Sequence, residues 1–403
     1  MKRPIRAIPF ARPALGRAEE RAVLRVMRSG WLTSGKVAGR FEREFADLVG
    51  TRHALAVNSA TGGLHLSLEA LGVTRGSRVI TSPYTYASTA EAIVYLGADP
   101  LFVDVEEESC NISTQGMEAA LAEQGRKVSA LLPVHVAGLP CRMTEISALA
   151  KQYQLPVVED AAHAFPVQLQ GRMAGTLGDA GVYSFYATKS ITTGEGGMIV
   201  TDSEPLARRM AMMRLHGIDR DAHKRLGGGG PSWFYQLEEA GFKYNMPDLC
   251  AAIGAVQLKK AGRFLQRRRS IAFAYREGLA GLDYLRLPEA GSPGGEGSVP
   301  EALRSGHAWH LFMVRLNPGI LSVDRDRFVA ELAAAGINVS VHFIPLHTMP
   351  YYRRRYGYAV EDFPVSMKIY RTTFSLPIYP SLTGRQVSRV IGTVRDLGRR
   401  FRR

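Results

Sequence analysis

The chain reads Ser184-Phe185-Tyr186-Ala187-Thr188-Lys189 at the point where an apolar, strand-like run ends. A second strand-like run, Met198-Ile199-Val200-Thr201, follows the glycine-rich turn after Lys189. Burial of a lysine between two strands is costly unless its ammonium group is paired or neutralised. Because desolvation lowers the pKa of a lysine, this position frees the amine to attack an aldehyde and to move a proton. A surface turn with a solvated lysine is the alternative.

A second segment, Glu159-Asp160-Ala161-Ala162-His163-Ala164, follows the apolar run Leu155-Pro156-Val157-Val158. The run suits a buried strand of a parallel sheet, which places Asp160 at the carboxyl end of that strand, where open α/β sheets bind ligands. An aspartate that caps the next helix is the alternative. With Lys189, this carboxylate supplies what pyridoxal phosphate chemistry needs, an amine for a Schiff base and an anion that keeps a ring nitrogen protonated.

A third candidate site lies where the strand-like run Ala54-Leu55-Ala56-Val57 meets Asn58-Ser59-Ala60-Thr61-Gly62-Gly63. We expect a helix to begin near Leu64. Small residues before a helix expose backbone N–H groups to an anion, and the Thr61 hydroxyl adds a donor. An ordinary helix cap is the alternative, and the absence of a GxxxxGK[ST] pattern argues against an ATP-type loop.

A tyrosine-rich segment, Pro83-Tyr84-Thr85-Tyr86, follows the strand-like run Arg78-Val79-Ile80-Thr81. An aromatic ring after a strand can lie flat on a pyridine ring, although tyrosines at such positions often serve packing alone. The segment therefore adds a candidate stacking group to the predicted cofactor pocket.

Several dispersed motifs make the chain similar to the DegT/DnrJ/StrS family of sugar aminotransferases, which has the aspartate-aminotransferase fold type of pyridoxal phosphate enzymes. The resemblance covers nearly the whole chain. Its motifs, in order, are Ile8-Pro9-Phe10, Ser29-Gly30-Trp31-Leu32-Thr33-Ser34-Gly35, Phe41-Glu42, Gly241-Phe242-Lys243-Tyr244-Asn245-Met246-Pro247-Asp248 and Val341-His342-Phe343-Ile344-Pro345-Leu346-His347.

The resemblance implies a role for each matching residue. Lys189 would carry the cofactor, Asp160 would bind its ring nitrogen, His163 would lie by the ring hydroxyl, and Tyr86 would stack on the ring. The cofactor phosphate would be held by Ala60, Thr61 and Ser184. Asn245 would reach the cofactor phosphate in the neighbouring subunit. Many relatives have Gln in place of His163. His342 is a candidate substrate contact, although a histidine between apolar residues is as often a core residue.

The arrangement of apolar runs predicts the fold class. Strand and helix patterns alternate from about residue 50 to 210, which indicates a mainly parallel sheet covered by helices. We expect a large cofactor domain at 1–250, with an N-terminal arm, and a smaller C-terminal α/β domain at 251–403. A helical run, Leu249 to Leu265, would link them. The loop between His216 and Trp233 is a candidate substrate lid, and a second Gly/Pro-rich loop spans Leu287 to Ser305.

Composition restricts the possible partners. The net charge is +14, with clusters at Arg267-Arg268-Arg269 and Arg399-Arg400-Phe401-Arg402-Arg403. This charge leaves a nucleic-acid-binding regulator as an alternative, although an anionic substrate such as a nucleotide sugar is a simpler partner. The three cysteines lack metal or disulfide spacing. No apolar run approaches the roughly 20 residues of a spanning helix, and nothing resembles a signal peptide, so we expect a soluble, cytoplasmic protein.

The family resemblance implies transamination of a keto sugar with L-glutamate as donor, in a homodimer with shared active sites. The segment Gly241 to Asp248 favours amination at C4 of a UDP-linked 4-keto sugar. A C3 aminotransferase, a keto-inositol aminotransferase and a sugar dehydratase on the same scaffold are alternatives. Dehydratase relatives replace the cofactor lysine with histidine, and the presence of Lys189 favours transamination.

Overall fold

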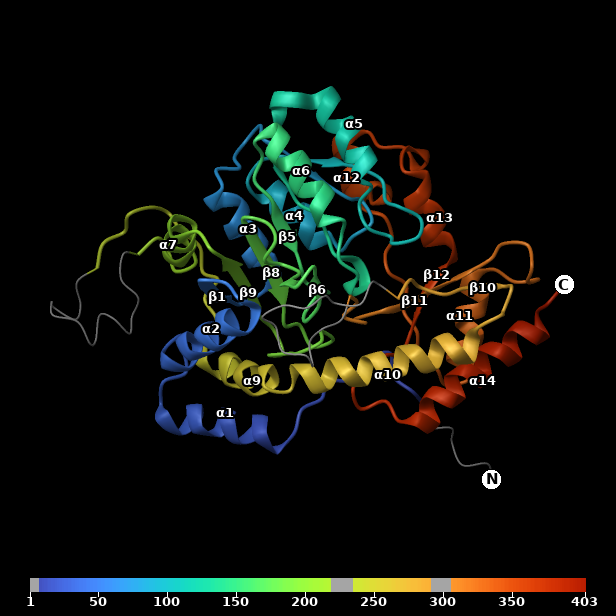
Figure 1. Cartoon of the computed structure of the whole chain (residues 1–403). Coiled ribbons are helices and arrows are strands. Elements are labelled where there is room, and N and C mark those ends of the chain that lie inside the picture. Colours follow the sequence, from blue (N-terminus) through green and yellow to red (C-terminus); the bar gives the residue numbers. More distant parts are fainter. Residues whose placement is uncertain (1–6, 219–234, 291–305) are drawn as a thin grey trace.

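Strands and helices alternate along the first half of the chain, as the apolar runs predict (Figure 1). The structure, a computed structural model, describes residues 7–218, 235–290 and 306–403. The elements of this half are α1 (Arg17–Ser29), α2 (Lys36–Val49), β1 (His53–Val57), α3 (Ala60–Ala70), β2 (Arg78–Thr81), α4 (Ala87–Tyr95), β3 (Asp99–Phe102), α5 (Thr114–Gln124), β4 (Val128–Leu131), α6 (Met143–Tyr153), β5 (Val158–Asp160), β6 (Gln168–Leu169), β7 (Arg172–Met173), β8 (Ala180–Ser184), β9 (Gly197–Thr201) and α7 (Glu204–Met213).

The main sheet has the strand order β1-β9-β8-β5-β4-β2-β3. Two blocks of strands, β1-β9-β8-β5 and β3-β2-β4, are joined by parallel bridges from Leu131 to Val157 and from Val134 to Asp160. Only β9 runs antiparallel to its neighbours in this sheet. The predicted mainly parallel sheet is therefore confirmed, and the carboxyl ends of β1, β5 and β8 lie along one edge.

Helices cover both faces of this sheet. Adjacent residues of β8 enter different cores, since Tyr183 packs with Phe41 and Phe45 of α2, while Val182 packs with Leu64 of α3. Burial on both faces explains why the strands are apolar throughout instead of alternating with polar residues. The structure also corrects the expected start of α3, which begins at Ala60 and not near Leu64.

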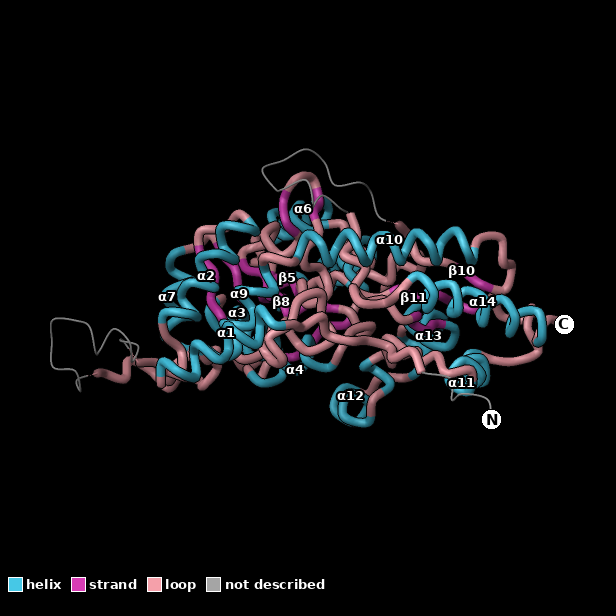
Figure 2. The backbone as a smooth tube through the Cα atoms, turned by 90° about the horizontal axis from the view of Figure 1, so that it is seen from below, coloured by secondary structure: helices cyan, strands magenta, loops and turns pink. Residues whose placement is uncertain are grey.

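The helical run after residue 248 is two helices, not one. Helix α9 (Asp248–Leu258) ends before Lys259, and α10 (Ala261–Leu279) begins after Lys260. The first turns of α10 pack in the core of the main sheet through Phe264, and its later turns pack in a second core through Tyr275. Figure 2 shows α10 running along the molecule between the two parts. The link between the parts is therefore α10, later in the chain than expected.

The second core surrounds a small antiparallel sheet in the order β10-β11-β12. Its residues include Ile8, whose backbone pairs with Ile337, so the N-terminal segment lies against the small sheet's part of the molecule. The elements here are β10 (Leu285–Arg286), β11 (Phe312–Leu316), α11 (Arg325–Ala334), α12 (Pro350–Tyr356), α13 (Pro364–Thr372), β12 (Thr373–Leu376) and α14 (Gly384–Arg400). Most of the candidate lid, His216 to Trp233, and most of the second loop, Leu287 to Ser305, lie outside the described residues.

Candidate active site

Lys189 lies in the turn that follows β8. Its backbone N–H donates to the carbonyl of Tyr186 at 3.0 Å, and Tyr186 pairs with Gly194, so the turn closes on itself. Part of the residue is accessible to solvent, but the surroundings of its amine are crowded. Burial lowers the pKa of Lys189 to about 8, and attraction to Asp160 opposes this shift. The turn therefore presents an amine that is partly unprotonated near neutral pH.

Asp160 is the last residue of β5, and its side chain is only 3% exposed. Its Oδ2 accepts a hydrogen bond from the Thr89 hydroxyl at 2.8 Å, and its Oδ1 accepts one from the Ala162 N–H at 3.1 Å. Burial raises the pKa of Asp160, while these two hydrogen bonds and the charge of Lys189 oppose the rise. The lysine and the aspartate predicted from the sequence are thus brought together, and each oxygen of the carboxylate accepts one hydrogen bond.

His163 and His342 also belong to this site. Burial, followed by repulsion from Lys189, lowers the pKa of both rings, that of His342 to about 4. The Nδ1 of His342 pairs with the Ser375 hydroxyl at 2.9 Å. The Nδ1 of His163 is buried with no hydrogen-bond partner among the described residues. Both imidazoles are therefore neutral at pH 7, and His163 keeps a free polar atom beside the lysine.

A third histidine, His310, was not singled out in the sequence. Its ring centroid lies 4.4 Å from that of His163, and the pKa of His310 is lowered well below its usual value by burial, then by the charges of His163 and Lys189. The two residues are distant in sequence, and no local pattern around His310 indicates the contact. His310 comes from the segment just before β11 (Phe312–Leu316).

The start of α3 forms the candidate phosphate site. The Ser59 hydroxyl caps the helix by accepting from the Gly62 N–H at 3.1 Å, which leaves Ala60 and Thr61 in its first turn. N–H groups in a first turn have no acceptor within the helix and face an anion favourably. Gly197 lies against Ala60, since a Cβ there would meet the Ala60 nitrogen at 2.8 Å.

Ser184, the remaining predicted phosphate ligand, reaches the same place from a different strand. It pairs with Gly197 across β8 and β9, and Gly197 also pairs with Val57 at the end of β1. Ser184 is nearly buried, and its hydroxyl accepts from the Tyr186 N–H at 3.3 Å. Ala60 and Ser184 therefore both lie beside Gly197, where a side chain would clash with the start of α3.

The two tyrosines after β2 have different surroundings. Tyr86 precedes the first residue of α4 and is 67% exposed, so its stacking role remains a prediction. Tyr84 is fully buried, and its hydroxyl donates to the backbone carbonyl of His342. The segment therefore ties the main sheet to the chain around His342, in addition to presenting Tyr86.

Asn245 lies beside the end of β1 in its own chain, where it pairs with Val57. Its amide nitrogen donates to the Ser34 hydroxyl at 2.6 Å, and its oxygen accepts from Lys243 at 2.6 Å. The Asp248 carboxylate accepts backbone N–H bonds from the start of α2 and from Gly35. Two motifs far apart in sequence thus form one unit, and whether Asn245 also reaches a partner subunit remains a prediction.

The arrangement fits pyridoxal phosphate. An amine of lowered pKa and a buried carboxylate lie together, a neutral histidine has an unpaired Nδ1, and a helix start with small neighbours can receive a phosphate. Among the described residues there is no group of histidine, cysteine and acidic side chains that could hold a metal ion. Those residues also contain no helix long and apolar enough to cross a membrane.

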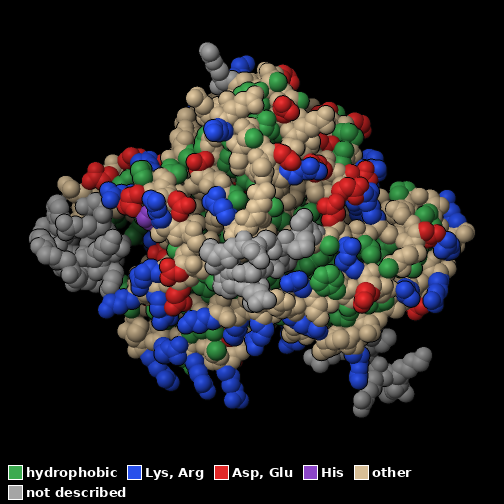
Figure 3. Space-filling model, in the orientation of Figure 1, with side chains coloured by type: hydrophobic (Ala, Val, Ile, Leu, Met, Phe, Trp, Pro, Cys, Tyr) green, Lys and Arg blue, Asp and Glu red, His purple; other side chains and the backbone are tan. Residues whose placement is uncertain are grey.

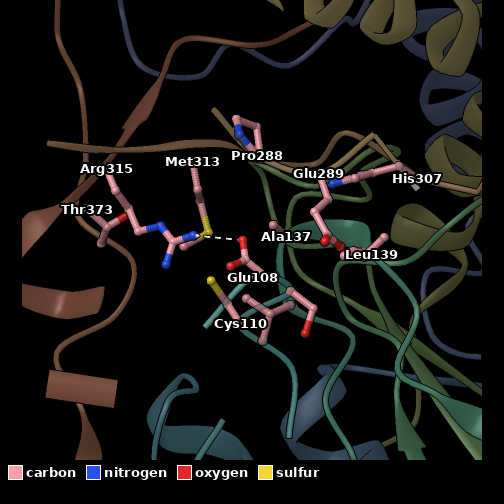
Figure 4. Close-up of a pocket in the computed structure, with 12 residues that line it drawn as sticks. Glu108, Cys110, Ala137, Leu139, Pro288, Glu289, His307, Met313, Arg315 and Thr373 are labelled. Carbon is pink, nitrogen blue, oxygen red and sulfur yellow. Dashed lines mark ion pairs between the residues drawn. The ribbon is translucent and has the colours of Figure 1, made fainter. Parts of the chain in front are cut away.

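A separate small pocket lies away from these residues (Figure 4). Glu108 and Cys110 come from the loop after β3, and Met313 and Arg315 come from β11. None of the predicted site residues lines it. The Arg315 side chain is already engaged there, since it pairs with Glu108 at 4.0 Å and donates to the Glu107 carbonyl at 2.6 Å.

The basic clusters noted in the sequence have internal partners. Arg268 is buried and donates to three backbone carbonyls, those of Trp309, His310 and Ile378. Near the C-terminus, Arg400 pairs with Glu331 at 3.2 Å, and Arg402 pairs with Asp283. Figure 3 shows other Lys and Arg side chains gathered along the lower edge, where Figure 1 places α1. Arg268 is therefore a structural residue, whereas Arg400 and Arg402 are exposed and make surface ion pairs within the chain.

Known proteins resemble the chain over nearly its whole length. A model of the DegT/DnrJ/EryC1/StrS aminotransferase family matches residues 13–395. The spore coat polysaccharide biosynthesis protein SpsC of Bacillus subtilis (strain 168) is 41% identical over 391 residues, which are 97% of each chain. The aminotransferase TlmJ from Streptoalloteichus hindustanus has a TM-score of 0.85 at 31% identity, with 98% of this chain and 99% of that chain covered. Spr1654 from Streptococcus pneumoniae, provisionally named a sugar aminotransferase and solved in its PMP form, has a TM-score of 0.88 at 28% identity, with the same coverage.

Proposed function

The chain belongs to the DegT/DnrJ/EryC1/StrS aminotransferase family and is an aminotransferase, and we propose that it uses pyridoxal phosphate to transfer an amino group from L-glutamate to a nucleotide-linked keto sugar. One observation carries the proposal, the Lys189 amine with its pKa lowered to about 8 beside the buried carboxylate of Asp160. The favoured acceptor is C4 of a UDP-linked 4-keto sugar. The names of SpsC and Spr1654 support a sugar substrate.

When bound, pyridoxal phosphate supplies an aldehyde and an electron-withdrawing ring. The Nζ of Lys189 would bond to the cofactor and move a proton at the reacting carbon, which its lowered pKa permits near neutral pH. Asp160 would keep the ring nitrogen protonated, because hydrogen bonds from Thr89 and Ala162 stabilise its charge. His163 would bond the ring hydroxyl, and Tyr86 would cover the ring.

The remaining candidates would hold the two ends of the reacting molecules. Ala60, Thr61 and Ser184 would bind the phosphate through the start of α3 and the end of β8. His342 would contact substrate through the Nε2 that Ser375 leaves available. We place the enzyme in the cytoplasm, where nucleotide sugars and glutamate are both available, and in polysaccharide biosynthesis.

A keto-sugar screen tests the substrate. The enzyme is first converted to its aminated form with L-glutamate, and the absorbance of the cofactor is then followed as each candidate sugar is added. Return of the original absorbance with a UDP-linked 4-keto sugar, and a slower or absent return with 3-keto sugars and keto-inositols, is the expected result. Preference for a 3-keto sugar or a keto-inositol would replace the favoured acceptor, and elimination of water in place of amination would indicate the dehydratase.

The proposed homodimer places Asn245 at the cofactor phosphate of the partner subunit. The variants Lys189→Ala and Asn245→Asp should each be inactive, the second because a carboxylate would face the phosphate in a medium of low dielectric. Mixing the two under subunit exchange should restore activity toward half per heterodimer, since one site then carries both defects and the other carries none. A mixture that exchanges subunits and stays inactive would show that Asn245 acts within its own chain.

A further inference from the structure

We propose that Thr89, supported by Thr85, is a positioning residue that keeps Asp160 ionised and correctly oriented, an inference that rests on the proposed function. The three side chains form a continuous hydrogen-bonded chain. The Thr89 hydroxyl lies 2.8 Å from Asp160 Oδ2, and the Thr85 hydroxyl lies 2.9 Å from that of Thr89. Neither threonine was singled out as a site residue in the sequence.

The direction of this chain follows from its chemistry. An ionised carboxylate only accepts hydrogen bonds, so the single hydroxyl hydrogen of Thr89 must point toward Asp160. The Thr89 oxygen is then free to accept from Thr85, which polarises the Thr89 hydroxyl further. Both donors thus stabilise the charge on Asp160 and favour the form that can hold a ring nitrogen protonated.

Burial makes the contribution large. Asp160, Thr85 and Thr89 are 3%, 2% and 0% exposed, so water does not replace a lost donor. Among the described residues, no lysine, arginine or histidine makes an ion pair with Asp160. The hydrogen bonds from Thr89 and Ala162 stabilise its charge most, and the more distant charges of Lys189 and His135 add to them. Burial alone would favour the protonated form of Asp160, so removal of the Thr89 hydroxyl should make Asp160 a weaker partner for the ring nitrogen. The cofactor should then withdraw electrons less strongly, although none of its own ligands has been removed.

The position of Thr89 on α4 gives it a second consequence. Its N–H donates to the Tyr86 carbonyl at 3.3 Å, one turn earlier at the start of the helix. The same helical turn therefore presents the candidate stacking ring and the hydroxyl that supports the carboxylate. A shift of this turn would therefore move Tyr86 and the Thr89 hydroxyl together.

The variant Thr89→Val tests the proposal, because valine keeps the shape and removes the donor. We expect the rate of the half-reaction with L-glutamate to fall by about tenfold or more, as for loss of a hydrogen bond to a charged group. The rate of Thr89→Ser should be within about threefold of the parent's rate. The rate of Thr85→Val should fall by about threefold, as for loss of a hydrogen bond between neutral groups.

Two further readouts separate positioning from folding. The dissociation constant of the cofactor is measured by titrating the apoprotein, and the pH at which the bound cofactor changes its absorbance is measured in each variant. For Thr89→Val we expect a larger dissociation constant for the cofactor and an absorbance change at higher pH. Without the Thr89 donor, the pyridine ring of the cofactor would hold its proton less firmly. It would then withdraw less charge from the nitrogen of Lys189, and that nitrogen would keep its proton to a higher pH. Thr89→Ser should restore both values.

Thr81→Val is the matched control. Thr81 is also fully buried, and its hydroxyl donates to the Leu132 carbonyl at 2.8 Å and not to Asp160. The variant Thr81→Val should lose a comparable hydrogen bond and a comparable free energy of unfolding. Its rate should stay within about twofold of the parent's rate, and the pH of its absorbance change should stay that of the parent. Equal losses in Thr81→Val and Thr89→Val, no rescue by serine, or an unchanged Thr89→Val would overturn the proposal.

Failure of the proposed function has a different outcome. A parent protein that binds no pyridoxal phosphate, or whose bound cofactor does not react with L-glutamate, would overturn both the proposed function and this inference. A parent that reacts normally while Thr89→Val does the same would overturn this inference alone.

Discussion

Glu159 and Asp160 are adjacent acidic residues at the end of β5, and both are buried, yet their surroundings differ. The Glu159 carboxylate accepts four hydrogen bonds, two at each oxygen, whereas Asp160 accepts one at each oxygen. The donors to Glu159 are His135 at 2.9 Å, Gly175 at 2.8 Å, Leu177 at 2.5 Å and Gly178 at 2.7 Å. Because Glu159 has no remaining acceptor site, it is a structural group, whereas each oxygen of Asp160 can accept one more hydrogen bond.

The difference shows that burial of a carboxylate does not by itself indicate function. On one side of β5, three of the four donors are backbone N–H groups of residues 175–178, and the fourth is the His135 side chain. On the other side, the two donors offset part of the cost of burial, and the pKa of Asp160 stays raised. Burial favours the protonated form of such an acid, and a ligand that contributes a further donor favours the ionised form, which is the expected property of a cofactor site.

The largest loss of activity is expected on substitution of Lys189, whose amine interacts with Asp160. Lys189→Ala should abolish transamination and the absorbance of the linked cofactor, because no other described group replaces the amine at this position. Assay of turnover and the absorbance spectrum check this result. Lys151→Ala, on the exposed face of α6, is the control and should behave as the parent. Normal turnover by Lys189→Ala would reject the assignment of the lysine.

The next effect concerns Asp160 itself. Asp160→Asn should lower the rate by more than tenfold, which is about 1.4 kcal/mol in the barrier, because a neutral amide cannot hold the ring nitrogen protonated. The apoprotein should be as stable as the parent at pH 7, or more stable. The raised pKa of Asp160 means that its contribution to stability is present at low pH and is lost as pH rises through the folded-state pKa. Urea unfolding and single-turnover rates measure both quantities, and a rate within tenfold of the parent would contradict the electron-withdrawing role.

Glu159→Gln should give the opposite pattern. The amide NH2 would face one or more of the backbone N–H donors, so we expect the free energy of unfolding to fall by about 1–3 kcal/mol. The loss of rate per folded molecule should be smaller than in Asp160→Asn. If Glu159→Gln were instead stable and inactive, and Asp160→Asn unstable and active, Glu159 and not Asp160 would be the functional carboxylate.

A smaller effect is expected in the pH dependence of cofactor attachment to the apoprotein. The reactive form of Lys189 is the free amine, so the rate of attachment should rise with pH and level off above about 8. In Asp160→Asn the midpoint should move to lower pH, because attraction to Asp160 raises the pKa of the amine. Stopped-flow absorbance at a series of pH values measures the midpoint, and an identical midpoint in the two proteins would mean that the two groups do not interact.

The contrast also shows what a single sequence can predict. Local patterns were enough to place Lys189 after β8 and Asp160 at the end of β5, because short apolar runs define strands and the residues that follow them. The supporting contacts depend on residues far apart in the chain. Thr89 lies 71 residues from Asp160, and His135 lies 24 residues from Glu159. Nothing in either segment alone indicates these pairs.

The prediction that α3 begins near Leu64 was wrong for a different reason. Gly62 and Gly63 suggest a turn, so the helix was expected after them. In the structure the glycines lie inside the helix, and Gly63 is packed so tightly that a Cβ would meet Val182 at 2.7 Å. Glycine here permits close approach of the helix to the sheet, and the Ser59 cap fixes the true start. Tertiary packing, which a local pattern cannot express, therefore decided the position of the candidate phosphate site.

Reduction of the cofactor-loaded protein with borohydride, followed by peptide mapping, tests the central claim most directly. The reagent makes the bond between cofactor and amine permanent, so mass spectrometry identifies the residue that carries it. The account predicts one modified peptide, with the cofactor on Lys189, and the same site in Glu159→Gln. Attachment at another lysine, or no attachment in a folded parent protein supplied with excess pyridoxal phosphate, would contradict it.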